Sequence, residues 1–115
     1  MGNGSVDTTA GNYRIHWLQG NGTAASAFTA ANALYAPLSG GGTNGSAFVL
    51  DILDYQNTNK YKTTRSLEGW DANGSGVISL ISGLWMGTSA VNIITLSGGN
   101  LTATDGSIAL YGIKG

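Results

Sequence analysis

The chain ends in DGSIALYGIKG, residues 105–115, where a turn signal leads into an apolar segment. Asp-Gly tolerates the positive φ that a tight hairpin demands, so residues 105–106 mark a turn. In Ser107–Ile113 an extended backbone would place apolar side chains on both faces. Such a segment is typical of a strand that has a core on one side and a neighbouring subunit or loop on the other.

Similar short apolar segments, separated by Gly, Asn and Asp, recur along the rest of the chain. Apolar segments of about four to eight residues, bounded by such turn-forming residues, indicate strands rather than helices. Asn-Gly, a hairpin dipeptide, occurs four times. We therefore predict an all-β fold, an antiparallel β-sandwich of jelly-roll type. The expected strands are Tyr13–Leu18, Ala47–Tyr55, Lys62–Trp70, Gly76–Ile81, Val91–Ser97 and Ser107–Ile113.

Two stretches do not fit this strand pattern. Ala24–Tyr35 is rich in alanine and could form a turn or two of helix or, equally, a surface loop; Pro37 would end any helix there. Ser39–Ser46 contains mainly Gly, Ser and Thr, which predicts a flexible connection.

Length and composition restrict the classes of function. The 115 residues are enough for a single domain spanning 1–115. A net charge of -1, with only 10% charged residues, argues against nucleic acid as a partner. The sequence has no apolar run of the ~18 residues that a membrane span needs, and its lack of cysteine excludes thiolate sites and disulfides. No cofactor is expected, and the low charge favours an assembled state.

The C-terminal half carries a resemblance to a known family. Residues 67–115, LEGWDANGSGVISLISGLWMGTSAVNIITLSGGNLTATDGSIALYGIKG, resemble in order and content a β-sandwich domain of tailed-bacteriophage virion proteins that ends in an LYGIKG strand. Residues 10–24, AGNYRIHWLQGNGTA, and 49–66, VLDILDYQNTNKYKTTRS, look like its earlier strands, so the resemblance runs from about Asp7 to the end. It implies a virion location and a structural role, in a tail fibre, tail tip or capsid appendage, rather than a reaction.

The chain also departs from the family pattern at its N-terminal end. Family members usually carry further strands before the segment that matches residues 10–17, whereas only Met1–Ala10 precede it here. A sandwich without its first strands would leave open edges and an uncovered core. The chain is then the C-terminal part of a longer polypeptide, or borrows strands from neighbouring chains, or is a shorter, divergent member. By analogy with virion fibres, the implied assembly is a homotrimer.

One segment imitates half of a calcium loop. Asp71, Asn73 and Ser75 place oxygen side chains at alternate positions, as a hard cation requires. The twelfth position is Ser82, however, where such loops carry a bidentate glutamate. A β-hairpin turn explains the same residues without a metal and is the preferred interpretation.

Candidates for catalysis are few. His16 is expected to share a strand face with Arg14 and Leu18, and no partner for a general base is evident. Asp51 and Asp54 fall on opposite faces of a regular strand, which makes them a poor glycosidase pair. The sequence therefore predicts a protein that is not an enzyme.

The chain has one cationic cluster, formed by Lys60, Lys62 and Arg65. Solvated positions that keep an edge strand from pairing with other edges are the preferred explanation. A site for an acidic partner is the alternative.

Aromatic and aliphatic residues suggest contact surfaces. Tyr55, Tyr61 and Trp70 are expected to flank loops at one end of the sheet, where exposed aromatic rings could stack on host-surface glycans. A second group is expected in the core or between subunits. Its members are Trp85, Val91, Ile93, Leu96, Leu110, Tyr111 and Ile113.

These expectations combine into a structural virion component. It would act through self-association and contacts with other virion proteins, with the loops Tyr55–Tyr61 and Gly69–Gly76 facing outward. The alternatives are a receptor- or glycan-binding module and a capsid decoration protein.

Overall fold

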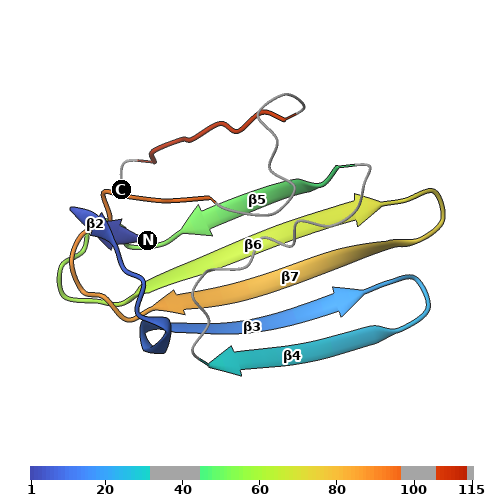
Figure 1. Cartoon of the computed structure of the whole chain (residues 1–115), viewed down its shortest axis with the longest axis horizontal. Helices are drawn as coiled ribbons and strands as arrows, with labels where there is room; N and C mark the ends of the chain where they lie inside the picture. Colours follow the sequence, from blue (N-terminus) through green and yellow to red (C-terminus); the bar gives the residue numbers. More distant parts are fainter. Residues whose placement is uncertain (32–44, 97–105, 114–115) are drawn as a thin grey trace.

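The structure, a computed structural model, describes residues 1–31, 45–96 and 106–113. These residues form an all-β fold with a single short 3₁₀ turn, η1, before the first long strand (Figure 1). The elements are β1 (Gly2–Asn3), β2 (Ser5–Val6), η1 (Ala10–Asn12), β3 (Tyr13–Gly20), β4 (Ala25–Ala31), β5 (Ala47–Ile52), β6 (Lys62–Asp71) and β7 (Gly76–Trp85).

Five strands form one antiparallel sheet in the order β4-β3-β7-β6-β5. Two tight hairpins build it, and both use the Asn-Gly dipeptides of the sequence. Between β3 and β4, the Asn21 side chain accepts hydrogen bonds from the backbone of Thr23 and Ala24. Between β6 and β7, Asn73 and Gly74 both have positive φ, 59° and 100°, as a type I′ turn requires.

The prediction of an all-β antiparallel fold is confirmed. Within the described residues there is one five-stranded sheet and the small β1–β2 hairpin, with no second large sheet facing the first. The sandwich and jelly-roll arrangement therefore stays a prediction. The hairpin is held to the chain's later part by a bridge between Gly2 and Ile93.

The interpretation of Ala24–Tyr35 as helix or loop was wrong for its described part, because Ala25–Ala31 is strand β4. All seven β4 residues pair with β3, and Phe28 stacks on Trp17 with ring centroids 4.9 Å apart. Cross-strand pairing here overrides the helical preference of alanine. Residues 32–35, and residues 39–44 of the expected connection, lie outside the described residues.

Two expected strands are not formed in the single chain. In residues 91–96 only Ile93 bridges to Gly2, and Val91 donates a backbone hydrogen bond to Tyr55 O at 2.7 Å. Ser97 lies outside the described residues. Ser107–Ile113 pairs with no described strand. Both segments have strand-like sequence, but sequence alone does not say which strand would pair with them.

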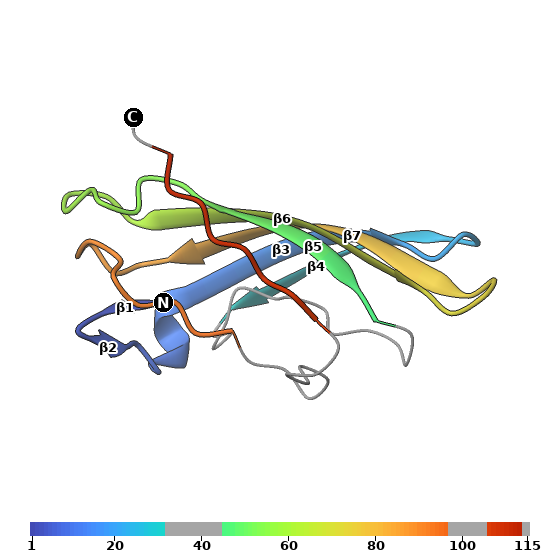
Figure 2. The ribbon, with the colours of Figure 1, turned by 90° about the horizontal axis from the view of Figure 1, so that it is seen from above.

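The two faces of the sheet have different surroundings. Figure 2 shows β1, β2 and η1 gathered on one side of the sheet, which we call the inner face. Side chains on the inner face alternate with those on the opposite, outer face along each strand. The buried side chains of the sheet all belong to the inner face. They are Tyr13, Ile15, Lys62, Thr64, Ser66, Glu68, Ser79, Ile81 and Trp85.

Candidate functional site

The inner face ends in a polar cluster that fastens the N-terminal segment to the sheet. Asp7 Oδ2 accepts hydrogen bonds from Trp85 Nε1 and Asn12 Nδ2, both at 2.8 Å, and Asp7 Oδ1 accepts one from the Thr9 amide. These bonds, the one from Trp85 above all, hold the pKa of Asp7 well below its usual range. A carboxylate kept ionised in this way serves as a structural acceptor and not as a proton donor near neutral pH.

Tyr13 completes this cluster beneath the N-terminus. Its hydroxyl donates to Asp7 O at 2.8 Å, and the Met1 amino group donates to the same hydroxyl at 3.3 Å. Burial, followed by the nearby Asp7 charge, raises the pKa of Tyr13. Burial also lowers the pKa of the Met1 amino group. The cluster therefore joins the start of the chain to β3 and β7.

Lys62 was expected to be solvated, and this is wrong: its exposed fraction is 0%. Its Nζ donates to three backbone carbonyls, Asn57 O at 2.6 Å, Lys60 O at 2.7 Å and Thr88 O at 3.1 Å. No residue pattern in the sequence indicates this burial, because the three acceptors are backbone atoms of two separate loops. The ammonium thus ties the β5–β6 loop to the segment after β7.

The other two members of the expected cationic cluster are exposed. Arg65 on the outer face pairs with Asp51 at 2.8 Å, and Lys60 lies 3.9 Å from Asp54. Since Lys62 is buried and Arg65 already has an acidic neighbour, the three residues do not form one cationic surface.

The residues considered for catalysis are not brought together. His16 is exposed on the outer face of β3. Asp51 lies on β5, whereas Asp54 lies in the turn beyond it with a φ of 56°. In the part of the chain that the structure describes, no three His, Asp or Glu side chains form a cluster that could hold a metal ion.

The calcium-like segment is a hairpin turn. Asp71 Oδ1 accepts hydrogen bonds from the amides of Asn73 at 2.7 Å and Gly74 at 3.3 Å, and Ala72 N donates to Ser75 O. Asp71 is therefore used to close the turn between β6 and β7. This geometry matches the preferred interpretation of the sequence.

Contrary to the expectation from the sequence, the three aromatic contact candidates do not lie at one end of the sheet. Tyr55 and Tyr61 lie in the β5–β6 loop, and Trp70 lies at the opposite end of β6. Nine residues of extended chain between Tyr61 and Trp70 correspond to about 30 Å. The prediction placed them together because all three are close to turns, but the two turns are at opposite ends of the same strand.

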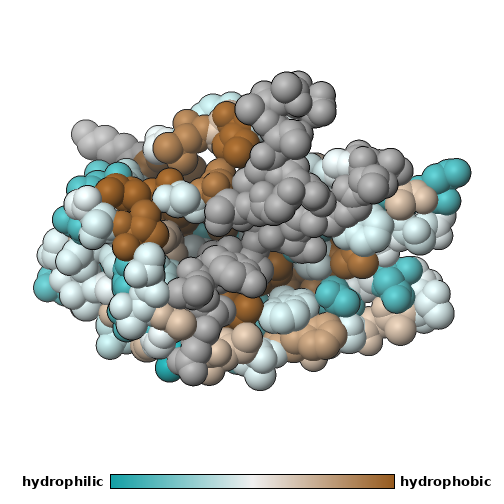
Figure 3. Space-filling view, viewed as in Figure 1, coloured by the Kyte–Doolittle hydropathy of each residue, from teal (hydrophilic) through white to brown (hydrophobic). Residues whose placement is uncertain are grey.

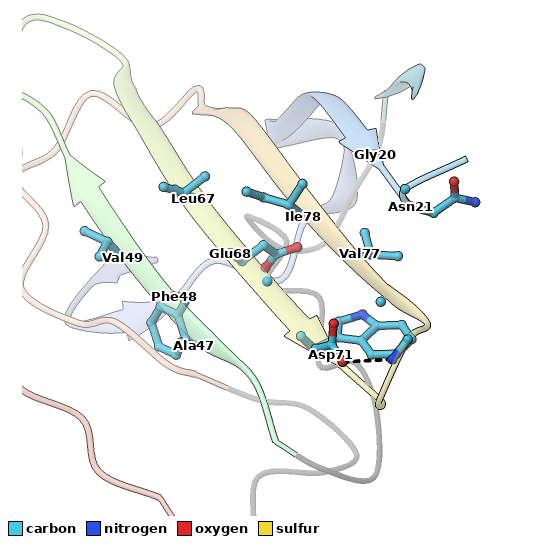
Figure 4. A pocket seen from close by; sticks show the side chains of 15 residues that line it. Gly20, Asn21, Ala47, Phe48, Val49, Leu67, Glu68, Asp71, Val77 and Ile78 are labelled. Carbon is cyan, nitrogen blue, oxygen red and sulfur yellow. Dashed lines mark hydrogen bonds between the residues drawn. The ribbon is translucent and has the colours of Figure 1, made fainter. Parts of the chain in front are cut away.

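Trp70 does line an open hollow at its own end of the sheet. The hollow has a volume of about 760 Å³ and is bordered by the β3–β4 and β6–β7 turns. Figure 4 shows the aliphatic side chains Val49, Leu67 and Ile78 at its border, together with Phe48. Its lining is mostly apolar, with Asn21 and Asp71 near the turns.

The residues expected in packing roles fall into two groups. Trp85 is buried, with 4% exposed, and Val91, Ile93 and Leu96 are half-buried. In the C-terminal segment the exposed fractions are 85% for Leu110, 83% for Tyr111 and 85% for Ile113. Figure 3 shows apolar surface where this segment crosses the upper part of the view. Among the described residues these three join no core, so their packing between subunits remains a prediction.

The largest feature that the sequence analysis missed is an aliphatic band on the outer face. We define the band as Leu18, Val49, Leu67, Ile78 and Leu80, which are 50–65% exposed. Leu18 pairs with Leu80, Leu80 with Leu67, and Leu67 with Val49. The signal was present as apolar residues at alternate positions of β7, such as Ile78 and Leu80, but the sequence does not tell which set of alternate positions faces solvent.

Comparisons with known proteins add no relative: no family model, curated protein or solved structure matches this chain. Among the described residues, no helix is long and apolar enough to cross a membrane.

Proposed function

We propose that this chain is a structural component of a tailed-bacteriophage virion. It would form a surface domain of a tail fibre, tail tip or capsid appendage, and act through self-association and contacts with other virion proteins. The proposal begins from the resemblance of residues 67–115 to phage virion β-sandwich domains.

The observation that carries the proposal is the state of the C-terminal segment. The residues that end the resembled domain, LYGI at 110–113, are extended, and all eight residues from Gly106 to Ile113 are exposed. Large apolar side chains that are more than four-fifths exposed favour a partner that covers them. An assembly subunit has such partners, and a homotrimer is the arrangement that we favour.

The composition supports the same conclusion. Only 10% of the residues are charged, whereas about 25% of the residues of a typical soluble domain are charged. Since most surfaces of an assembled subunit are covered, such a subunit needs less charge.

Mass spectrometry of intact virions of the phage that encodes the chain tests the proposal. We expect the chain in multiple copies per particle, and incorporation lowered at least about tenfold by Leu110→Lys. Ser107→Lys, in the same exposed segment, is the matched control and should be incorporated normally. A chain that is abundant in the infected cell but absent from purified virions would overturn the proposal. A subunit heavier than 11.7 kDa would identify a longer fibre protein, and one of that mass at high copy a decoration protein.

A receptor- or glycan-binding module is the second candidate. Its support is the open hollow beside Trp70, since an apolar surface with polar groups at its border suits a sugar ring. Tyr55 and Tyr61 cannot contribute to the same site, because they lie at the other end of β6. Glycan-array binding that is lost on Trp70→Ala but kept in Tyr61→Ala would favour this candidate.

A further inference from the structure

Apolar side chains lie on both faces of the sheet. The inner face carries the buried core residues Tyr13, Ile15, Ile81 and Trp85 beside the polar Lys62, Thr64, Ser66, Glu68 and Ser79, whereas the outer face carries the exposed aliphatic band. In a sheet with one covered face, the apolar residues normally lie on the covered side. The aliphatic band on the outer face is therefore an exposed apolar patch of the kind that a partner covers.

We infer that a second copy of this chain covers the outer face, sheet against sheet, with the aliphatic band at the centre of the contact. This inference rests on the proposed function and adds a second contact to its self-association: two trimers, each formed elsewhere on the chain, would be paired through this face into a hexamer. It concerns a different surface from the C-terminal segment.

The size of the face suits such a contact. Five strands spaced about 4.8 Å apart and up to ten residues long, at about 3.3 Å per residue, span roughly 24 by 30 Å. The resulting ~700 Å² approaches the ~800 Å² that each partner contributes to a standard protein interface. Two sheets can also pack face to face at about 10 Å, with interdigitated side chains.

The charges of the face favour a second copy over a charged partner. The outer face carries two cations, Arg14 and Arg65, and two anions, Asp51 and Asp71, so its net formal charge is zero. Arg65 and Asp51 already neutralise each other at 2.8 Å. A neutral face gives a nucleic acid or an anionic membrane no electrostatic attraction, and it does not repel an identical face.

The relief of the face also suits a two-fold contact. Ile78 is 60% exposed, and its cross-strand neighbours are Gly20 and Gly69, which have no side chain. Ile78 therefore projects beside a shallow depression over the two glycines. In a two-fold contact both copies use the same patch, so the projecting side chain of one copy can enter the depression of the other.

The first test is the oligomeric state of the full 115-residue chain, by sedimentation and light scattering over a range of concentrations. We expect wild-type chain to form pairs, or multiples of pairs, and Leu80→Lys to weaken them about 30-fold or more, as the loss of a central contact does. Val6→Lys is the matched control, because Val6 is 37% exposed in β2, which lies on the inner side of the sheet. Circular dichroism checks that both variants fold.

A cysteine test locates the contact. The chain has no cysteine, so a single introduced one can form a disulfide only with another copy. Oxidised Leu80→Cys should give a covalent dimer, and Val6→Cys, on the inner side of the sheet, should not.

Three results would overturn the inference. They are a monomer at all concentrations, an oligomer that Leu80→Lys leaves intact, and a trimer that Leu80→Cys does not cross-link. Each leaves the proposed function to be judged separately by the virion measurement. Conversely, Leu80-dependent pairs of a chain that is absent from virions would support the face-to-face contact and overturn the proposed function.

Discussion

The inner and outer faces of the five-stranded sheet differ in a way that polarity alone does not predict: the inner face buries several polar side chains, and the outer face exposes aliphatic ones. The inner face holds the buried aromatic residues Tyr13 and Trp85 but also a lysine and several hydroxyl side chains. The outer face holds five aliphatic residues that are at least half exposed. If burial followed hydrophobicity alone, the buried lysine and hydroxyl side chains would be exposed and the five aliphatic residues would be buried.

Hydrogen bonding accounts for the polar residues of the inner face, and the proposed pairing of two copies would account for the apolar residues of the outer face. Buried polar groups are tolerated when they have partners, as Lys62 does in three backbone carbonyls. The exposed aliphatic residues have no comparable compensation within the described part of the chain. We therefore expect the inner face to determine the stability of the single chain and the outer face to determine its association.

The largest effect is expected at Trp85 on the inner face. Trp85→Ala removes a buried ring and the hydrogen bond to Asp7, and should lower the free energy of unfolding by about 3–5 kcal/mol. Urea denaturation followed by circular dichroism measures this loss. The matched change, Leu80→Ala, should cost less than about 1 kcal/mol at a protein concentration where the chain is monomeric. Equal losses in the two variants would remove the distinction between the faces.

A smaller loss is expected at Lys62. Lys62→Met keeps most of the buried aliphatic stem but leaves three carbonyl groups without their donor, so we expect a loss of about 2–3 kcal/mol. Thermal or urea unfolding measures it. Lys60→Met is the control, since Lys60 is exposed and 3.9 Å from Asp54, and should change stability by less than about 0.5 kcal/mol. If the two variants behave alike, the buried ammonium does not stabilise the fold.

The success of the sequence predictions depended on local information. Strands β3 and β7 were predicted from their alternation, and β6 from the turn-forming residues around it, such as Asn73-Gly74; all of these signals lie within a few residues. The sequence could not show that Lys62 is buried, because its acceptors Asn57 and Thr88 come from separate loops. It also could not separate Trp70 from the tyrosines, because closeness to a turn does not tell which end of the sheet that turn occupies.

At the N-terminal cluster we expect a pH-dependent effect. Asp7→Asn weakens the bonds from Trp85 and Asn12 and should cost about 1–2 kcal/mol at pH 7. The folded pKa of Asp7 lies below the unfolded value of about 3.9, so its contribution is present above that pH and is lost as the pH falls toward the folded pKa. The gap between wild type and variant should therefore be constant from about pH 7 to 5 and shrink below about pH 4. Asp54→Asn is the control, and a gap that widens on acidification would contradict this role.

The β6–β7 turn fixes which residues face inward, since a slip of one residue exchanges the faces. Gly74 has a φ of 100°, so Gly74→Val should cost about 1 kcal/mol or slightly more. Ser75→Val, at a neighbouring position of the same turn, is the comparison and should cost less. Urea unfolding measures both, and an equal cost would show that the turn tolerates other backbone geometries.

The smallest effect on the isolated chain is expected at Leu67, in the middle of the aliphatic band. Leu67→Thr keeps strand propensity and removes only exposed apolar surface, so it should change stability by less than about 0.5 kcal/mol in dilute solution. When the protein concentration is raised, pairing stabilises the wild type by mass action and the difference should grow. Unfolding curves at two concentrations about a hundredfold apart measure this. A loss above about 1 kcal/mol that is independent of concentration would mean that Leu67 packs within the chain, and the outer face would then no longer differ from the inner one in its role.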